Sequence, residues 1–203
     1  MGIPINLVVE DPLSETVARV ILRDTGRDFF VQYAHGLKGF QYIKRNIKGF
    51  NNASRFTPYF ILTDLDNGKC APALIQSWFA RLTKHTNCIF RVAVREVEAW
   101  LLADSEGFSK FLGISSKLIP NFIEDIERPK EFLISLAKKS RYRHIKEDII
   151  PSSDLTKVGP DYNGRLSYFV QNEWRLSTAQ KSSKSLDKAI RALKNFRPCI
   201  SVD

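Results

Sequence analysis

Short apolar runs alternate with amphipathic stretches through the first half of the chain. Four runs are rich in branched and aromatic residues and have the length of strands. The predicted strands are residues 5–9, 29–34, 59–63 and 88–94. Because strands that alternate with helices require crossover connections, they favour a parallel sheet. We therefore expect an α/β fold with a mainly parallel four-stranded sheet flanked by helices.

Helical patterns separate these strands. Asp11 suits an N-cap and Pro12 suits the first helical position, where its missing N–H costs nothing. Gly26 is expected to end this first helix. A regular apolar stripe over residues 71–82 predicts another, and a further helix begins at residue 97.

The segment 36–55 allows two interpretations. Phe40, Ile43 and Ile47 recur at helical spacing, which favours a helix with one apolar face. The segment also contains five basic residues, no acidic residue and several interleaved aromatics, which suit a basic loop with aromatic contacts. The basic residues are Lys38, Lys44, Arg45, Lys48 and Arg55.

The pattern changes after residue 104. Strand signals stop, and short helical stretches interrupted by proline and glycine follow. A Gly- and Pro-rich loop is expected over residues 150–164, and an amphipathic helix over 185–196. We therefore divide the chain into an α/β core, 1–104, and a mostly helical, basic C-terminal extension, 105–203, packed on it.

Acidic residues follow three of the predicted strands. Glu10 comes after the first, Asp64 and Asp66 after the third, and Glu96 and Glu98 after the fourth. Since the carboxyl ends of parallel strands share one edge, these carboxylates are expected to converge there. Converging carboxylates repel unless a cation lies among them, and Mg²⁺ prefers oxygen ligands. All five are candidate ligands of Mg²⁺ or Mn²⁺, and which of Glu96 and Glu98 binds stays open.

The Asp64-Leu65-Asp66-Asn67-Gly68 stretch is the most informative local pattern. Two aspartates at alternating positions beyond a strand bring both carboxylates to one edge. The alternative is a simple turn, because Asp, Asn and Gly all favour turns.

The order and spacing of these acids resemble the Toprim fold of topoisomerases, primases and OLD-family nucleases. That fold pairs a Glu after its first strand, here Glu10, with an Asp-x-Asp after its third, here Asp64-Leu65-Asp66. Residues 95–104 (REVEAWLLAD), 159–166 (GPDYNGRL) and 183–186 (SKSL) look like a bacterial Toprim-like family, domain of unknown function 4276. The resemblance spans most of the chain.

The resemblance implies a Mg²⁺-dependent nuclease in which Glu10, Asp64, Asp66 and Glu98 are the catalytic metal ligands. It further implies a separate partner ATPase of the ABC or SMC-like kind, as in bacterial anti-phage defence systems. One departure concerns the Glu-Gly-x-x-Glu pattern of OLD-like domains. Asp11 occupies the Gly position here and Glu15 lies one residue too far along, so Glu15 is better interpreted as a first-turn helix acid.

Basic residues supply candidate phosphate contacts. The formal net charge is +9, which suits a polyanion held near bound metal, although a solubilising surface is the plainer interpretation. Lys157 is also a candidate catalytic residue, because Lys and Arg side chains stabilise charge that develops in phosphoryl transfer. The candidate nucleic-acid or phosphate contacts are Lys69, Arg141, Arg143, Lys157 and Arg165.

Several classes of protein are not supported. The longest apolar runs are far shorter than the roughly 18 residues of a membrane span, and no secretion signal precedes the first strand. Cys70, Cys88 and Cys199 form no disulfide or zinc pattern. No P-loop sequence occurs. We therefore expect a cytoplasmic protein without membrane segments, acting on nucleic acid, with DNA favoured.

Three functions remain open from the sequence. The leading one is the Toprim-type nuclease. A non-catalytic Toprim-like module that binds nucleic acid or an ATPase is the second. A haloacid-dehalogenase-type phosphatase is the third, although Asn67 and Lys69 depart from the Asp-x-Asp-Gly-Thr pattern of those enzymes.

Overall fold

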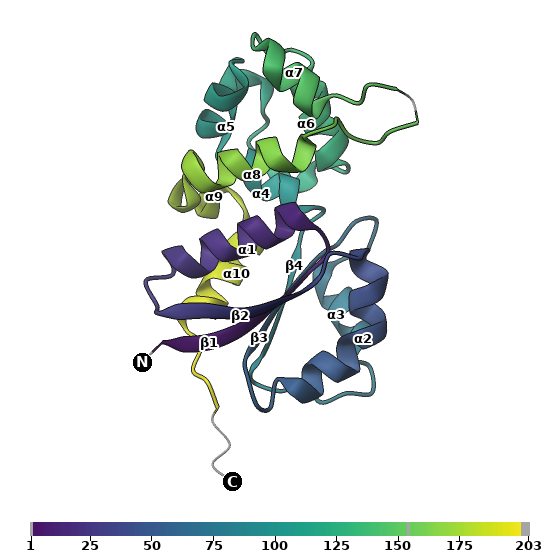
Figure 1. The fold of residues 1–203 in the computed structure, drawn as a ribbon, viewed down its shortest axis with the longest axis vertical. Helices are drawn as coiled ribbons and strands as arrows, with labels where there is room; N and C mark the ends of the chain where they lie inside the picture. The colour runs from purple at the N-terminus through teal and green to yellow at the C-terminus, as the bar shows by residue number, and fades with distance from the viewer. Residues whose placement is uncertain (1, 154, 200–203) are drawn as a thin grey trace.

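A parallel sheet with helices on both faces forms one part of the molecule, and a cluster of short helices forms the other (Figure 1). The computed structural model describes residues 2–153 and 155–199. The elements are β1 (Ile3–Val9), α1 (Pro12–Asp24), β2 (Phe29–Gly36), α2 (Gly39–Ala53), β3 (Tyr59–Asp64), α3 (Ala71–Phe79), β4 (Cys88–Ala93), α4 (Val97–Leu102), α5 (Ser105–Leu112), two 3-10 turns (Ser116–Leu118 and Ile123–Asp125), α6 (Pro129–Ala137), α7 (Arg143–Ile149), α8 (Tyr162–Asn172), α9 (Leu176–Ser182) and α10 (Lys184–Lys194).

The strand order is β2-β1-β3-β4, and every neighbouring pair is parallel. This confirms the α/β class and the four-stranded parallel sheet. The ambiguous segment 36–55 is helical, since α2 covers residues 39–53. Two helices, α7 and α9, were not expected from the sequence.

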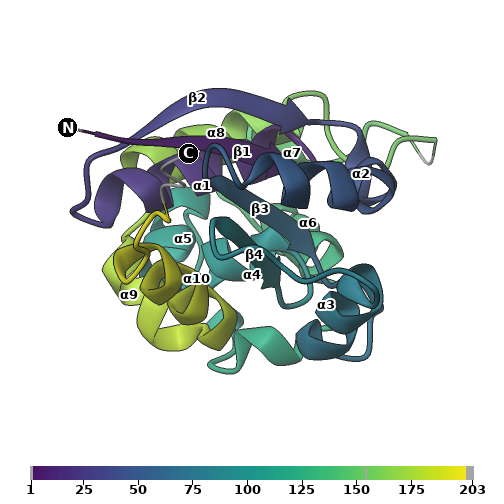
Figure 2. The same ribbon diagram turned by 90° about the horizontal axis from the view of Figure 1, so that it is seen from below.

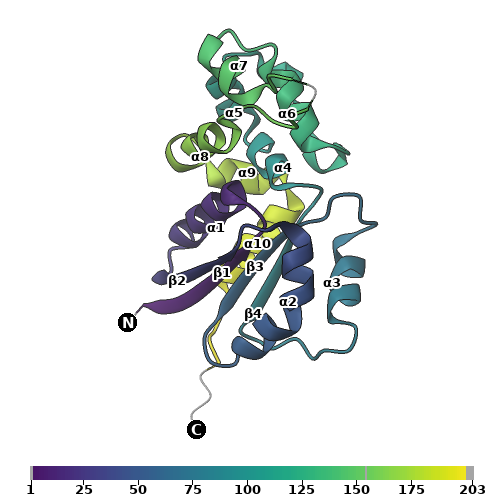
Figure 3. The same ribbon diagram turned by 45° about the vertical axis from the view of Figure 1, so that its right-hand side comes forward.

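Burial along the strands follows their positions in the sheet. Every residue of the central strand β3 is buried, as its continuous apolar run predicts. The edge strand β2 is largely exposed, with Phe30 at 48% and Tyr33 at 65%. The difference arises because α2 and α3 lie on one face of the sheet, mainly over β1, β3 and β4. They leave part of β2 uncovered (Figures 2 and 3).

The two faces of the sheet belong to separate hydrophobic clusters. On one face Ile5 and Leu7 pack with residues of α1 and α10. On the other, Val8 and Ile61 pack with residues of α2 and α3. Figure 3 shows α1 and α10 on one side of the strands and α2 and α3 on the other.

The helical part shares its core with the sheet. The cluster that contains Ile5 also contains Phe108, Phe169 and Leu193, so it runs continuously from β1 to α10. The last helix returns to pack beside β4. Within the described residues, none of the helices has the length and hydrophobicity that crossing a lipid bilayer requires.

An ion pair between a buried acid and a partly exposed arginine joins the starts of α5 and α9. Asp104 is fully buried and caps α5 by accepting a hydrogen bond from the backbone N–H of Gly107 at 3.1 Å. It also accepts from the backbone N–H of Arg175 at 2.9 Å and from its Nε at 3.0 Å. Asp104 is therefore a buried cap rather than a surface acid.

Candidate functional site

The register of the central strands places Glu10 next to the end of β3. Val8 pairs with Ile61, so Glu10 lies beside Thr63 two positions later. Its Oε1 accepts hydrogen bonds from the Thr63 hydroxyl and, at 2.9 Å, from the backbone N–H of Asp64. The helices that leave β1 and β2 pack on opposite faces, so the strand order reverses between β1 and β3. Ligands of open α/β sheets bind at such a point.

Asp64 ends β3 and faces the start of α4. It is 8% exposed, and its Oδ1 accepts a hydrogen bond from the backbone N–H of Val97 at 3.0 Å. This bond ties the end of β3 to the first residue of the helix that follows β4. The second oxygen, Oδ2, is left for another partner.

Asp66 projects from a tight turn. Its φ of 48° lies in the left-handed region, which Asp tolerates better than most residues. The turn closes with a bond from the Gly68 N–H to the Leu65 carbonyl at 2.8 Å. Arg95 fixes it further by donating to the carbonyl oxygens of Asp66 and Gly68, both at 3.1 Å. The exposed Asp66 side chain therefore sits on a rigid support.

Glu98, from α4, brings a second buried carboxylate to this edge, after Asp64. It is 1% exposed, and its Oε1 accepts from the Tyr162 hydroxyl at 2.9 Å and pairs with the Lys130 ammonium at 3.4 Å. Its Oε2 is buried and has no hydrogen-bond partner among the described residues. An unsatisfied buried carboxylate oxygen is costly, so it marks a place where a further partner is expected.

Glu96 has a different environment. Its carboxylate accepts from the backbone N–H of Lys130 at 2.7 Å and so caps the start of α6. It also lines the cleft described below. Of the two glutamates after β4, Glu98 is the buried one with a free oxygen, and Glu96 supports a helix.

The acidic groups disturb one another electrostatically. Burial raises the pKa of Asp64 well above its usual range, and the charges of Glu98 and Glu10 raise it further. Burial also raises the pKa of Glu10, in spite of its hydrogen bonds, and the charges of Asp66 and Asp11 add to this. These pKa shifts indicate that the carboxylates lie within electrostatic range of one another.

Lys130 and Tyr162 partly offset this repulsion. Burial raises the pKa of Glu98, and the Lys130 charge opposes that rise. Burial lowers the pKa of Lys130, but the charges of Glu98 and Glu96 more than compensate, so it stays charged. Burial and the Glu98 charge raise the pKa of Tyr162, which keeps its hydroxyl protonated as a donor.

The carboxylates fit a hard cation only in part as they stand. Among residues 2–153 and 155–199, no three acidic, histidine or cysteine side chains are grouped closely enough to hold a metal ion. One carboxylate oxygen of each of Glu10, Asp64 and Glu98 accepts hydrogen bonds from the protein. Among the described residues, the Oε2 atom of Glu98 has no partner and is the oxygen best placed to bind a ligand. Binding of one shared ion would therefore require these side chains to leave the positions that they have in the structure.

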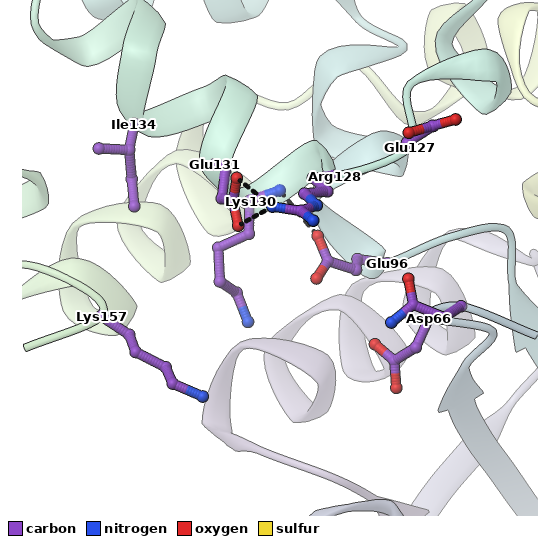
Figure 4. A pocket seen from close by; sticks show the side chains of 9 residues that line it. Asp66, Glu96, Glu127, Arg128, Lys130, Glu131, Ile134 and Lys157 are labelled. Carbon is purple, nitrogen blue, oxygen red and sulfur yellow. Dashed lines mark hydrogen bonds and ion pairs between the residues drawn. The ribbon is translucent and has the colours of Figure 1, made fainter.

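A cleft of 580 Å³ opens beside Asp66 and Glu96 (Figure 4), and Glu10, Asp64 and Glu98 are not among its lining residues. Lys130 and Lys157 extend into it from the helical side, opposite Asp66 and Glu96 (Figure 4). Its lining residues are Asp66, Asn67, Glu96, Glu127, Arg128, Lys130, Glu131, Ile134 and Lys157. The structure thus brings the candidate Lys157 together with two candidate metal ligands.

The other candidate phosphate contacts lie elsewhere. Arg143 pairs with Glu147 at 2.7 Å on α7, at the end of the helical part farthest from the sheet (Figure 1). Arg165 is ion-paired with Asp148, and Arg141 lies 5.0 Å from the ring centre of Tyr142. Lys69 is exposed just beyond the Asp66 turn and does not line the cleft. Glu15 pairs with Arg19 at 2.7 Å, in keeping with a first-turn acid.

Three residues that contact or influence the acidic site were not identified as site residues from the sequence. Lys130 sits one residue after a proline at a helix start, and nothing local distinguishes it from other lysines. Tyr162 belongs to the GPDYNGRL segment, so its position was visible but its role was not. Asp11, assigned only as a cap, accepts from the Ser14 N–H at 2.7 Å and also adds negative charge to the site.

A comparison of the chain with protein families, with curated proteins and with solved structures finds no match. The case for function therefore rests on the residues and geometry given above.

Proposed function

We propose that this protein is a Mg²⁺- or Mn²⁺-dependent Toprim-type nuclease that hydrolyses phosphodiester bonds, with DNA as the favoured substrate. One observation carries the proposal. Buried or half-buried carboxylates from three chain segments, Glu10, Asp64 and Glu98, converge where the strand order reverses, and Glu98 keeps an unsatisfied oxygen. Such an arrangement costs stability unless it serves a ligand.

We assign metal binding to one set of residues and the orientation of the metal ligands to another. Glu10, Asp64, Asp66 and Glu98 would hold one or two divalent ions. A bound ion of this kind supplies a water of lowered pKa and stabilises charge on the phosphate oxygens. Thr63 and the Asp64 N–H orient Glu10, while Tyr162 orients Glu98.

The opposite wall of the cleft suits the scissile phosphate. Lys130 and Lys157 project into the cleft as cations. Ammonium groups aimed at developing negative charge lower the barrier of phosphoryl transfer. Lys157 is therefore proposed as a catalytic residue. Lys130 is proposed to lie between the carboxylates and the bound substrate.

The test compares wild type with an Asp64→Asn/Asp66→Asn double variant on plasmid DNA and on RNA, with Mg²⁺ or Mn²⁺. The variant should lose cleavage by at least about a thousandfold, because metal and nucleophile positioning fail together. Glu15→Gln, an acid paired with Arg19 on the surface of α1, is the matched control and should cleave as wild type does. Equal cleavage by the double variant and wild type refutes the assignment.

The resemblance also supports a partner ATPase of the ABC or SMC-like kind in an anti-phage system of the bacterial cytoplasm. Activity should then rise when the ATPase and ATP are added. Cleavage of the same rate with and without the partner would remove this part of the proposal.

A non-catalytic module is the second candidate, and Lys130 is the observation that favours it. Its ammonium lies 3.4 Å from Glu98 and already neutralises part of the acidic cluster. Tight metal binding by calorimetry without cleavage of any substrate, partner included, would support this alternative. A trapped aspartyl-phosphate at Asp64 would instead support the phosphatase.

A further inference from the structure

The outer side of β2 and α2 forms a surface that the catalytic proposal does not use. We call it the basic–aromatic surface. Its exposed side chains are Phe30, Tyr33, Lys38, Phe40, Lys44, Arg45, Lys48, Arg55 and Phe56. The whole stretch of residues 29–63 contains no Asp or Glu, although the chain has 22 acidic residues.

The cations of this surface are uncommitted. Across residues 2–153 and 155–199, none of its five Lys and Arg side chains forms an ion pair. Lys38 lies over the Tyr42 ring, 5.4 Å from its centre. Elsewhere, cations such as Arg19, Arg143 and Arg191 pair with acids one turn away on their own helices. The acid-free stretch therefore presents a net positive field to solvent.

One aromatic ring of the surface, Tyr33, lies beside a cluster of three further rings, His35, Phe50 and Tyr59. His35 lies 6.0 Å from Phe50 and 6.1 Å from Tyr59, measured between ring centres, and Tyr33 lies 6.2 Å from His35. Tyr33 is 65% exposed beside this cluster. A ring that lies beside other rings but is open to solvent can stack on a planar ligand at little further entropic cost.

The surface is continuous with the carboxylate edge. The backbone N–H of Leu37 donates to Val9 at 3.0 Å, and that of Gly39 donates to Glu10 at 3.1 Å. The start of α2 is thus fixed directly to the strand end that carries Glu10. From there α2 extends for 15 residues, or about 22 Å, along the face of the sheet that carries Val8 and Ile61.

We propose that the basic–aromatic surface binds single-stranded nucleic acid and leads one strand toward the carboxylate edge. Lys and Arg side chains would track the phosphates, while Tyr33 and Phe40 would stack on unpaired bases. A duplex hides its base faces, so exposed aromatic rings beside cations favour a single strand. The guiding role rests on the proposed nuclease function, whereas binding itself does not.

A second copy of the chain is the main rival occupant, because β2 is an edge strand. A two-fold contact through this surface would place five unpaired cations of each copy against those of the other. The charge therefore favours a polyanion over self-association.

Binding is measured by fluorescence anisotropy with a labelled 20-nucleotide single strand and the matching duplex, in EDTA so that no cleavage occurs. One variant is Lys44→Gln/Arg45→Gln/Lys48→Gln, and the other is Tyr33→Ser/Phe40→Ser. The charge control is Lys110→Gln/Lys117→Gln/Lys139→Gln, exposed cations of the helical part. The aromatic control is Phe122→Ser, a 77% exposed ring of that part. Circular dichroism checks that each variant is folded.

The charge variant should bind the single strand at least tenfold more weakly, and the slope of log K against log salt should fall by about 2. The aromatic variant should bind at least fivefold more weakly with an unchanged salt slope. Both controls should stay within twofold of wild type.

Unchanged affinity in both surface variants overturns the proposal, as does duplex binding that is tighter and insensitive to Tyr33→Ser/Phe40→Ser. A wild-type dimer in light scattering that the aromatic variant converts to monomer, with binding unchanged, assigns the surface to self-association instead. Because these measurements need no metal, their failure leaves the Asp64→Asn/Asp66→Asn cleavage test unaffected. Failure of that cleavage test would likewise leave single-strand binding standing.

Discussion

Two buried carboxylates, Asp104 and Glu98, lie six residues apart in sequence and differ in how their charge is met. Asp104 accepts hydrogen bonds from the Gly107 N–H, the Arg175 N–H and the Arg175 guanidinium, and no atom of its side chain is left unpaired. Glu98 has one partially exposed lysine, one tyrosine and a buried oxygen that has no partner among residues 2–153 and 155–199.

We interpret this difference as one between a structural acid, Asp104, and an acid that we propose to bind a ligand, Glu98. Burial of a charge is tolerated when hydrogen bonds and a counter-charge replace water. Asp104 meets that condition within the protein. Glu98 and Asp64 do not, which suggests that part of their environment is meant to come from a ligand. Opposite stability effects should follow when the two kinds of acid are changed.

Asp104→Ala should cause the largest loss of stability, about 2–3 kcal/mol, because it removes the cap of α5 and leaves the backbone N–H groups of Gly107 and Arg175 without their acceptor. Urea unfolding followed by circular dichroism measures this. Glu106→Ala removes the other, exposed acid that contacts Arg175 and should cost less than about 0.5 kcal/mol. Similar losses in both variants would contradict the structural role of Asp104.

Lys130→Met should destabilise the protein by about 2 kcal/mol at pH 7, since it leaves buried Glu98 without its cation. The loss should shrink as the pH falls, because the raised pKa of Glu98 lets it accept a proton early. Arg128→Met, an exposed cation paired with Glu131 in the same cleft, should have little effect. A loss that is independent of pH would show that packing, rather than charge, is involved.

Asp64→Asn should raise the free energy of unfolding of the metal-free protein at pH 7, by less than the Lys130→Met variant lowers it. The folded-state pKa of Asp64 lies above its unfolded value, so wild-type stability falls as the pH rises from the unfolded pKa toward the folded one. The amide keeps an oxygen for the Val97 N–H but carries no charge. The advantage should vanish in acid, where Asp64 is protonated. Thermal unfolding in EDTA at several pH values measures it, and destabilisation at every pH would count against the account.

Tyr162→Phe should have the smallest effect, about 1 kcal/mol, through loss of its hydrogen bond to Glu98. Tyr168→Phe, on the exposed side of the same helix, should be neutral. Thermal unfolding of both variants measures the difference. Equal stability of Tyr162→Phe and wild type would mean that Glu98 does not depend on this bond.

The sheet and its acids could be predicted from local patterns because three of the four strands are largely apolar runs that are followed closely by a carboxylate. Parallel pairing then brings Glu10 and Asp64 to one edge whatever the details of the loops. The pairing of Val8 with Ile61 sets the register of β1 and β3. This register brings Glu10 within hydrogen-bond distance of the Asp64 N–H.

The helical contribution was less predictable. Short helices such as α7 and α9 have few turns, so their apolar spacing is hard to distinguish from a loop. Lys130 reaches Glu98 only because α6 packs on α4, a contact that no local pattern encodes. For the same reason the positions of Arg141, Arg143 and Arg165, away from the cleft, could not be known from their charge alone.

Calorimetric titration of the metal-free protein with Mn²⁺ and Mg²⁺ tests the central claim most directly. The carboxylate edge should give saturable binding in wild type, and Asp64→Asn and Glu98→Gln should each weaken it by at least tenfold, while Asp24→Asn on the surface leaves it unchanged. Wild type that binds no divalent ion, or binding that survives both substitutions, would contradict the claim that these buried carboxylates exist to hold a cation.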